Sequence, residues 1–589
     1  MGSETKTCQN CHNQFIVEPE DFVFYEKMRV PPPTFCPECR MVRRFVFRNE
    51  RNLFRRKDDV SGKEIFSMYS PEVPVKIYEK DYWWSDAWDA TEYARDYDFA
   101  RPFFEQFREL MYAVPWASRI ITNIVNSDYA NNAYYLKNCY LCFGIGYSED
   151  SAYAIDGIVK NSFDVTSATN SELCYDGMAV RDCYRTFFSY ACEKCHDVWF
   201  SRDCVACSDC FGCANLRNKQ YYIFNKAYTK EDYEVEIARI LDGGSYHANE
   251  EAKKMAYAVW QAHPYKYMLS WHNTNVTGDW IVASKNVQHC FNVAELEDSK
   301  YCQNVGYVGI GGGKDCYDYT LWGEQAELIY EAVQCGNACR DVKFSWNCWP
   351  ADQSVEYSVH CHSASDIFGC VGLKKKSYCI FNKQYTKEDY LLLREKIIRH
   401  MQTMPYTDAQ GRIYSYGEFF PPAFSPFAYN QTIAQDFFPL AKEEAQKEGF
   451  IWRDPETHEY QTTIDAAHLP DRIADVQDSI LKEIVKCLSC GKAFRIIQME
   501  LEFLQRMSLP LPRECPPCRH AARLRLRNIP RFYRRQCQCA GEKSGNGVYQ
   551  NQTPHTHAAD HCPNEFETSY APDQKEIVYC EECYQAEVV

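Results

Sequence analysis

Cysteine is abundant in this sequence and unevenly placed, and its distribution constrains the fold more than any other feature. Of the 32 cysteines in 589 residues, four lie in residues 1–60, 19 in residues 139–379 and nine in residues 487–583. A small disulfide-stapled scaffold would need more than roughly 8% cysteine, whereas an ordinary enzyme carries far less than this chain. The cysteines divide the chain into two end modules and a large middle, joined by the cysteine-free stretches 40–138 and 380–486.

The two ends are copies of each other. Each carries two C-x-x-C pairs separated by 24 residues, and the second copy follows the first at an offset of 479 positions without a gap. Four thiolates suit a tetrahedral zinc ion, because each pair presents two sulfurs to one metal. Redox-active or simply buried thiols are the alternative, but redox motifs are rarely duplicated as two pairs at both ends. The predicted ligands are Cys8, Cys11, Cys36 and Cys39, and then Cys487, Cys490, Cys515 and Cys518.

Each copy resembles the treble-clef and zinc-ribbon modules of bacterial proteins over about 45 residues. The matching pattern is C-x-x-C, a phenylalanine and then P-x-x-C-P-x-C-R-x-x-R-R, which runs from Cys8 to Arg44 in the first copy. The resemblance implies that the second cysteine pair opens a helix, whose N-terminal dipole favours thiolates. Sites with four thiolates are closed, so a structural and non-catalytic role is expected for them.

The copy relation continues past these pairs and predicts a third zinc site, in the C-terminal module alone. That module adds a C-x-C and a C-x-x-C motif where the N-terminal copy has no cysteine. We expect Cys537, Cys539, Cys580 and Cys583 to be the ligands, which makes about three zinc ions in the whole chain. The intervening loop offers substitute ligands at His555, His557, His561 and Cys562.

A basic segment surrounds the second copy. Residues 486–535 hold twelve Lys or Arg and three Asp or Glu, a charge of +9 inside a chain of net charge −16. Arg519, Arg523, Arg527 and Arg531 recur every fourth residue, which is one face of a helix if the helix runs that far. Such a stripe suits the phosphate backbone of RNA or DNA. The alternatives are a solvated or protein-facing charged surface, or pairing with the acidic remainder of this chain.

The middle of the chain contains a second duplication, with an offset of 157 positions between residues 208–233 and 365–390. Short polar and apolar units recur about every 10–11 residues within each copy. This beat predicts a solenoid, here a parallel β-helix with coils of roughly 20 residues. An antiparallel meander or sandwich is the alternative. Each copy ends in a predicted helix, with Thr229 or Thr386 as its N-cap.

Four cysteines in the first copy are spaced like an iron–sulfur motif. Cys204, Cys207, Cys210 and Cys213 are separated by two residues each, whereas the ferredoxin pattern needs three residues before its fourth cysteine and then proline. The duplicate has Ala364 and Ile367 at the two inner positions, so the fold does not require four ligands there. Buried thiols stacked in the solenoid are favoured, with a metal cluster or reactive thiols as alternatives.

The predicted fold is multidomain and mainly β: a duplicated parallel β-helix-like solenoid flanked by treble-clef or zinc-ribbon modules, with helical connectors. The expected boundaries are 1–60 for the N-terminal zinc module, 61–118 for an aromatic helical connector, 119–235 for solenoid repeat A, 236–274 for a helical connector, 275–404 for solenoid repeat B with a terminal helix, 405–483 for a Pro- and aromatic-rich connector, and 484–589 for the C-terminal zinc module.

Catalytic signatures are missing from the sequence. The run from Gly306 to Lys314 fails as a phosphate-binding loop, because Asp315 replaces the Ser or Thr that would contact magnesium. The triplet His360-Cys361-His362 can hold a metal or supply a nucleophile, but such triplets are more often structural. The catalytic residues are therefore unknown, and zinc is the one cofactor expected.

Charge and hydropathy narrow the partners and the compartment. The net charge of −16 argues against a protein that coats nucleic acid generally. No run approaches roughly 18 apolar residues, and the first six residues lack the apolar segment of a secretory signal. We therefore expect a cytoplasmic protein with no membrane partner, in a reducing compartment where cysteines bind metal or are buried.

Together these features resemble large cysteine-rich bacterial proteins with zinc modules at both ends, some of which are labelled as CaiB/BaiF-family coenzyme A transferases. No dinucleotide-type fold pattern or nucleophilic-aspartate context supports that activity here, so the resemblance implies family membership and no reaction. The expected function is a zinc-binding scaffold that binds RNA, DNA or a protein. The alternative is an enzyme with its active site on the solenoid face, acting on a saccharide or nucleotide-type substrate.

Overall fold

The computed structural model describes residues 2–306, 310–454, 460–557 and 560–588. The chain forms two compact units, each built from two separate segments. The first unit combines residues 1–120 with 268–454, and the second combines residues 121–267 with 455–589. The N-terminal cysteine module therefore shares a unit with repeat B, and the C-terminal cysteine module shares one with repeat A. In the described part of the chain, no helix is both long and apolar enough to cross a bilayer.

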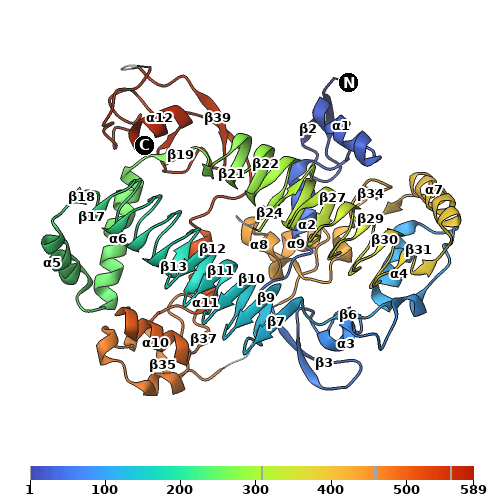
Figure 1. Ribbon diagram of the computed structural model, residues 1–589, viewed down its shortest axis with the longest axis horizontal. Coiled ribbons are helices and arrows are strands. Elements are labelled where there is room, and N and C mark those ends of the chain that lie inside the picture. Colours follow the sequence, from blue (N-terminus) through green and yellow to red (C-terminus); the bar gives the residue numbers. More distant parts are fainter. Residues whose placement is uncertain (1, 307–309, 455–459, 558–559, 589) are drawn as a thin grey trace. The chain divides into compact units, whose positions relative to one another are not determined.

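Repeat A is a stack of short parallel strands, as the solenoid prediction required, and Figure 1 shows them lying side by side in chain order. The last strand is antiparallel and ends the stack. The strands are β7 (Ile121–Val125), β8 (Ala130–Asn131), β9 (Ala133–Lys137), β10 (Cys142–Glu149), β11 (Ile155–Lys160), β12 (Phe163–Glu172), β13 (Tyr175–Met178), β14 (Tyr184–Phe187), β15 (His196–Trp199), β16 (Ser208–Phe211), β17 (Gln220–Ile223) and β18 (Lys226–Ala227).

The coils of repeat A are shorter than predicted. Tyr184 pairs with His196, His196 with Ser208, and Ser208 with Gln220. One coil therefore takes 12 residues over much of the stack. The larger predicted coil, about 20 residues as in longer solenoid repeats, is wrong. Nearly every third residue in these coils has a left-handed backbone, as at Asp203, whose φ is 50°. Asn and Asp tolerate this conformation better than other non-glycine residues, which explains their frequency at these positions.

Small side chains fill the inside of the coils. The residue that follows a left-handed position is typically buried in the core of the stack, where a short coil leaves room for small groups only. These core residues include Cys183, Cys192, Cys195, Val198, Cys204, Cys207, Cys210 and Cys213.

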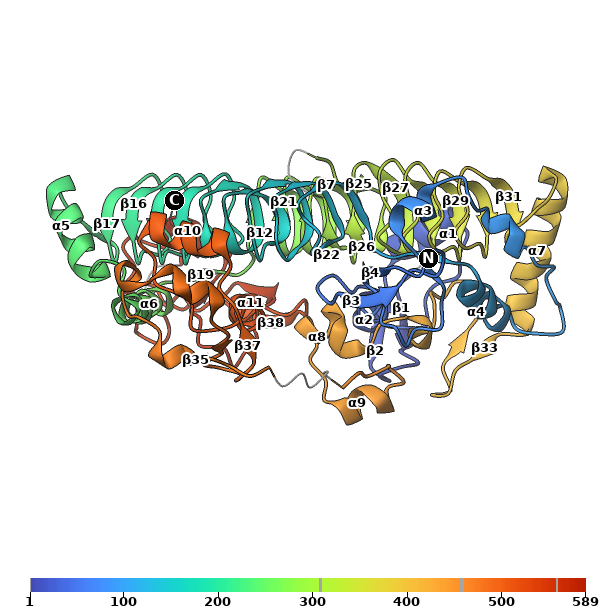
Figure 2. The ribbon, with the colours of Figure 1, turned by 90° about the horizontal axis from the view of Figure 1, so that it is seen from below.

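Repeat B, in the first unit, is built in the same way, and Figure 2 shows the coils of each repeat following one another along its stack. Arg340 pairs with Gln353 and Gln353 with Ser365, so the coils in this part of repeat B hold 13 and 12 residues. The spacing is 17 residues where Leu296 pairs with Gly313. The strands are β20 (Ser270–Trp271), β21 (Thr274–Val282), β22 (Lys285–Ala294), β23 (Leu296–Lys300), β24 (Gln303–Val305), β25 (Gly313–Lys314), β26 (Tyr317–Trp322), β27 (Ala326–Val333), β28 (Arg340–Lys343), β29 (Gln353–Glu356), β30 (Ser365–Phe368), β31 (Ser377–Ile380) and β32 (Lys383–Gln384).

Each repeat runs into a capped helix, as predicted. Thr229 accepts a hydrogen bond from the backbone N–H of Asp232 at the start of α5 (Lys230–Leu241), and Thr386 accepts one from Asp389 at the start of α7 (Lys387–Thr403). A further helix, α6 (Tyr246–Ala262), follows α5. In the first unit α4 (Phe103–Ala113), in the aromatic connector, packs Phe103 against the rings of Phe368 and Phe381 in repeat B.

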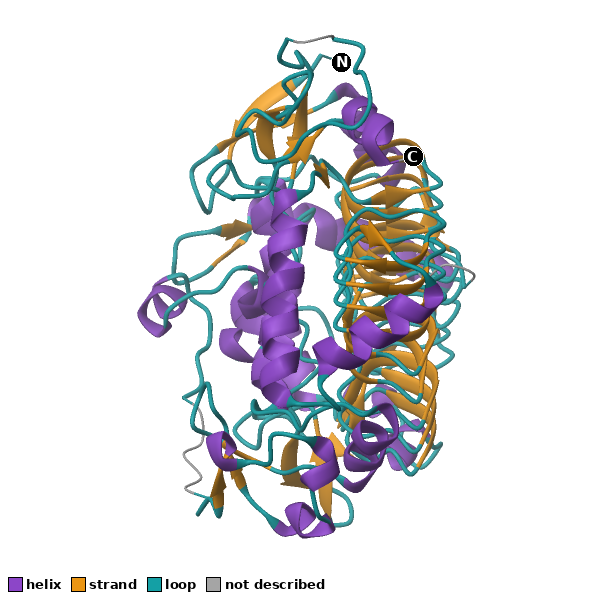
Figure 3. Cartoon of the chain, turned by 90° about the vertical axis from the view of Figure 1, so that its left-hand side faces the viewer, coloured by secondary structure: helices purple, strands orange, loops and turns teal. Residues whose placement is uncertain are grey.

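The two cysteine modules repeat one element order, so the sequence duplication is also structural. Figure 3, coloured by secondary structure, shows the strands of the solenoid as a ladder of short arrows. The N-terminal module contains β1 (Glu4–Thr7), β2 (Gln14–Val17), α1 (Pro19–Met28), α2 (Pro37–Phe45), and then β3 (Phe54–Lys57), β4 (Glu64–Ser67), β5 (Ile77–Tyr78) and α3 (Lys80–Trp84). The C-terminal module contains β36 (Val485–Lys486), β37 (Ala493–Phe494), α10 (Gln498–Met507), α11 (Pro516–Leu524), β38 (Tyr533–Gln536), β39 (Glu565–Thr568), β40 (Val578–Tyr579) and α12 (Glu581–Val588).

Candidate metal centres

The first predicted cysteine group comes together between a hairpin and a helix. Cys8 and Cys11 lie in the turn between β1 and β2, and Cys36 is the N-cap of α2, with Cys39 in its first turn. The Sγ atoms of Cys11 and Cys36 are 3.7 Å apart, and the backbone N–H of Cys36 donates to Cys8 Sγ at 3.2 Å. Sulfurs about 2.3 Å from a tetrahedral ion would be roughly 3.8 Å apart, so the group fits a metal.

The second group has the same geometry. Cys515 is the N-cap of α11, its Sγ lies 3.6 Å from that of Cys490, and its backbone N–H donates to Cys487 Sγ at 3.2 Å. All four ligand atoms of each group lie within 4.8 Å of one another. The structure therefore brings together all eight of these predicted ligands, and the helix predicted at the second pair is present in both modules.

The thiols within a group share their protons unevenly. Hydrogen bonds from Cys36 and Cys39 lower the pKa of Cys8, whereas neighbouring cysteines and burial raise the pKa of Cys39. In the second module, burial opposes ionisation of Cys487, but backbone N–H donors bring its pKa to about 7. Four adjacent thiols cannot all ionise without a cation, so a bound divalent metal would displace protons as it binds.

The third group differs from the prediction in one ligand. Its members are Cys537, Cys562, Cys580 and Cys583, so Cys562 takes the place predicted for Cys539. The backbone N–H of Cys580 donates to Cys537 Sγ at 3.2 Å, the same contact as in the other two groups, and α12 begins directly after Cys580. The Sγ atoms of Cys562 and Cys580 are 3.9 Å apart.

Cys539 instead belongs to a fourth group, which the sequence reasoning did not assemble. Its members are Cys539, His555, His557 and Cys583, the last shared with the third group. His561 lies at the surface and joins no such group among the described residues. The available signal was a surplus of donors: this module has more cysteines and histidines than one tetrahedral ion can use.

Two arginines of the predicted basic stripe, Arg519 and Arg523, point into the protein, whereas Arg531 is exposed. The Arg519 side chain is 8% exposed and pairs with Glu500 at 2.7 Å and Asp164 at 3.1 Å. That of Arg523 is 3% exposed and lies 3.1 Å from Asp164 and 3.0 Å from Asp176. Burial raises the pKa of Asp164, and the two arginines counteract this.

The predicted nucleic-acid face is therefore not formed as one helical stripe. Helix α11 ends at Leu524, before Arg527 and Arg531. Arg519 and Arg523 are occupied by carboxylates of the same chain, which was one of the alternatives for this segment.

The N-terminal module makes the same kind of contact with repeat B, as the duplication requires. Arg44 and Arg40 stand at the positions of Arg523 and Arg519 under the 479-residue offset. Arg44 lies 3.0 Å from Asp318 and 3.2 Å from Glu331. Arg40 pairs with Asp318 at 2.9 Å, and Arg43 pairs with Glu331 and Glu418 at 2.6 and 2.9 Å.

The solenoid cysteines are buried, hydrogen-bonded thiols. Cys204, Cys207, Cys210 and Cys213 each lie within hydrogen-bonding distance of the carbonyl oxygen two residues earlier, at 3.3–3.6 Å from the sulfur. Among the described residues they do not form a group of mutually close metal ligands. Their geometry fits packing in a stack, which was the favoured interpretation.

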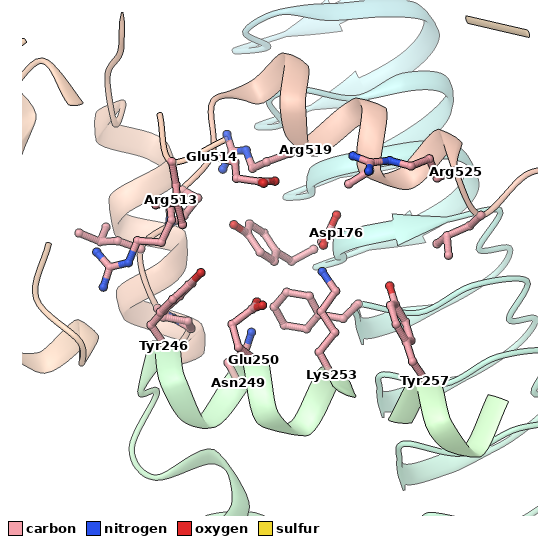
Figure 4. A pocket seen from close by; sticks show the side chains of 18 residues that line it. Asp176, Tyr246, Asn249, Glu250, Lys253, Tyr257, Arg513, Glu514, Arg519 and Arg525 are labelled. Atoms are coloured by element: carbon pink, nitrogen blue, oxygen red, sulfur yellow. The ribbon is translucent and has the colours of Figure 1, made fainter. Parts of the chain in front are cut away.

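A pocket of about 390 Å³ lies in the second unit, between α6, α11 and strand β13. Figure 4 shows Asp176 and Lys253 pointing toward each other inside it. Burial alone would lower the pKa of Lys253, but Asp176 and other anionic neighbours hold it at about 12, so the ammonium stays charged. The triplet His360-Cys361-His362, expected to be structural, is buried in the first unit, and burial lowers the pKa of both imidazoles to about 3.

Comparison with known proteins adds little. No family model matches this chain, and no curated protein matches it. Among solved structures, that of a "putative acetyltransferase" from Desulfovibrio desulfuricans G20 is similar over 50% of this chain and 75% of that one, at 8% identity and a TM-score of 0.09. A similarity this weak supports no argument about fold or function.

Proposed function

We propose that the protein is a zinc-binding scaffold in which each metal module fastens a β-solenoid. The observation that carries this proposal is the set of buried arginines that each metal-site helix inserts between carboxylates of its own repeat. Zinc is the proposed metal, because closed four-thiolate sites of this spacing suit its tetrahedral preference. The parallel stacks of short, regular coils support a parallel β-helix as the solenoid type.

The arginines connect successive coils. Asp164 and Asp176 occupy equivalent positions in neighbouring coils, because the residues before them, Phe163 and Tyr175, pair in the parallel ladder. Stacked carboxylates repel, so they need a cation between them. Arg523 supplies it in repeat A. Asp318 and Glu331 are stacked in the same way in repeat B, where Arg44 contacts both.

A bound metal ion would fix the position of the helix that carries these arginines. The N-cap of α11 is the ligand Cys515, so coordination fixes the start of the helix that carries Arg519 and Arg523. Without the ion, the cysteine turn and the start of α11 would be joined only by hydrogen bonds, such as those from Leu488 N–H to Arg513 O and from Cys515 N–H to Cys487 Sγ, and by side-chain packing. We infer that metal binding and the packing of the module on its repeat are thermodynamically coupled.

Nucleic acid is the partner proposed for the scaffold. Its binding through residues 486–535 would need side chains other than the buried Arg519 and Arg523, such as the exposed Arg525. A filter-binding titration with RNA and DNA over a range of salt tests it. Binding that weakens as salt rises would support nucleic acid as the partner, and no binding at low salt would contradict it.

The enzyme alternative receives less support. The described pocket holds Lys253 near the carboxylates of Asp176, Glu250 and Glu514, which keep it charged, and a charged lysine is a poor nucleophile or base. The closed cysteine groups leave no open coordination position for a substrate. Metal analysis by mass spectrometry of protein purified without chelator tests the scaffold proposal: zinc in the cysteine groups is expected, and fewer than two zinc ions per chain would contradict it.

A further inference from the structure

We propose that the C-terminal module holds two zinc ions that share the thiolate of Cys583. One ion would be bound by Cys537, Cys562, Cys580 and Cys583, and the other by Cys539, His555, His557 and the same Cys583. This inference rests on the proposed zinc-binding function and deepens it, because it raises the expected content from about three ions to four.

The number of donors fits two ions with one bridge. Two tetrahedral ions need eight ligand positions, and seven side chains fill them when one thiolate serves both. In each group all ligand atoms lie within 4.8 Å of one another. His557 Nε2 lies 3.4 Å from Cys583 Sγ, a separation compatible with two ligands of one ion.

Both histidines are oriented by a partner on the opposite ring nitrogen. His555 Nε2 lies 2.9 Å from Glu587 Oε1, and these side chains are 1% and 0% exposed. His557 Nδ1 donates to the carbonyl oxygen of Asp560 at 2.7 Å. The nitrogens left for a metal are then Nδ1 of His555 and Nε2 of His557. A histidine held by a carboxylate or carbonyl is the usual outer-shell arrangement of zinc ligands.

Glu587 is itself held in place, which argues for a built site. It accepts hydrogen bonds from the Tyr549 hydroxyl at 2.9 Å and from the backbone N–H groups of Gln552 and Thr553 at 2.8 and 3.2 Å. Together with the contact to His555 at 2.9 Å, these hydrogen bonds hold the carboxylate of Glu587 where it orients the ring of His555.

The sulfurs also receive hydrogen bonds that suit metal-bound thiolates. The side-chain amide of Asn551 donates to Cys539 Sγ at 3.2 Å, and that of Asn564 donates to Cys580 Sγ at 3.4 Å. Five thiolates carry five negative charges, and two Zn²⁺ ions would reduce the net charge of the cluster to −1. A single ion would leave Cys539 and two oriented histidines facing one another without a metal.

The cluster would act as a cross-link. Cys539 follows β38, while Cys580 and Cys583 flank the start of α12. On α12, the hydroxyl of Tyr584 donates to Asp203 of repeat A. Two shared ions would tie the histidine-bearing loop and this helix into one body. Neither ion has an open position, so the cluster is structural.

Native mass spectrometry of the full-length chain and its single variants tests the inference. The wild type should hold four zinc ions. His557→Ala and Cys539→Ser should each hold three, and Cys580→Ser should also hold three. Cys583→Ser should hold two, because only the shared ligand serves both ions. His561→Ala, in the same loop but exposed, is the matched control and should hold four.

Three ions in the wild type, or four in both His557→Ala and Cys539→Ser, would overturn the two-ion cluster while leaving the zinc scaffold intact. Fewer than two ions in the wild type would instead contradict the scaffold proposal itself. If Cys583→Ser fails to fold, X-ray absorption of the wild type decides: a zinc–zinc shell at roughly 3.5–4 Å supports the shared thiolate, and its absence overturns it.

Discussion

Two neighbouring arginines at the end of α11 have opposite surroundings. Arg523 is buried between Asp164 and Asp176, whereas Arg525 is exposed to solvent. Packing of the module on repeat A removes water from the carboxylates of Asp164 and Asp176. The positive charge of Arg523 compensates for this loss of hydration. A buried ion pair stabilises little compared with an apolar pair, but loss of one partner is costly because a charge is left alone.

We expect Arg523→Met to lower the free energy of unfolding of the second unit by about 3–5 kcal/mol. The control Arg525→Met should change it by less than about 0.5 kcal/mol. Adding Asp164→Asn to Arg523→Met should recover part of the loss, because it removes an unpaired charge. Urea unfolding followed by circular dichroism measures these values, and equal effects of the two single variants would contradict the buried contact.

Buried histidines give the first unit a dependence on pH. The amide of Asn347 donates to Nδ1 of His360 at 2.6 Å, a bond that a protonated ring cannot accept, and burial lowers the pKa of His360 from 6.5 to about 3. The unfolded chain then binds more protons than the folded one between pH 6.5 and pH 3. Stability is therefore full above pH 6.5 and is lost as the pH falls through that window.

For His360 the expected loss at pH 5 is about 2 kcal/mol. The indoles of Trp116 and Trp346 lie 5.1 and 4.8 Å from its ring, so tryptophan fluorescence reports on this region. When the pH falls from 7.5 to 5, the free energy of unfolding of His360→Gln should therefore fall by about 2 kcal/mol less than that of the wild type. The same pH dependence in both proteins would show that His360 titrates normally.

At the scale of single elements, the cysteines of the end modules and those of the solenoid coils have different surroundings. Those in the hairpins and at the helix starts of the end modules have their sulfurs close to one another, whereas those in the coils lie near backbone carbonyls. We expect Cys490→Ser to release one zinc ion and Cys207→Ser to release none. Zinc counted per folded chain checks this. Loss of metal from the coil variant would mean that the solenoid thiols are ligands after all.

The sequence allowed prediction of the elements that depend on local spacing. The duplicated C-x-x-C pairs identified two four-cysteine groups, and Thr229 and Thr386 were placed correctly as helix caps. The true coil length was missed, because a left-handed residue at every third position breaks the alternation by which strands are recognised. The partners of Arg523 were also missed: Asp164 is 359 residues away, and only the stacking of coils places it beside Asp176.

At the scale of the molecule, each metal module pairs with the repeat that is not next to it in sequence. The N-terminal module belongs with repeat B, and the C-terminal module belongs with repeat A. Neither unit is a continuous stretch of chain, so each requires two segments to meet. Closing these long loops costs entropy, which the buried charges and metal sites help to offset.

Separate fragments test this pairing. Residues 121–267 and 455–589, produced as two chains, should associate in the presence of zinc and separate after chelation. Residues 1–120, which carry the other zinc module, are the mismatched control and should not bind 121–267. Size-exclusion chromatography distinguishes these results, and equal binding of both modules to repeat A would contradict a specific pairing.

The central claim is that the metal holds each module against its repeat. Hydrogen–deuterium exchange before and after zinc removal measures this most directly, at strands β12–β13 and β26–β27, which carry the carboxylates that the module arginines contact. We expect removal of zinc to accelerate exchange at these strands as well as in the modules. Faster exchange confined to the modules, with β12–β13 and β26–β27 as protected as before, would contradict it.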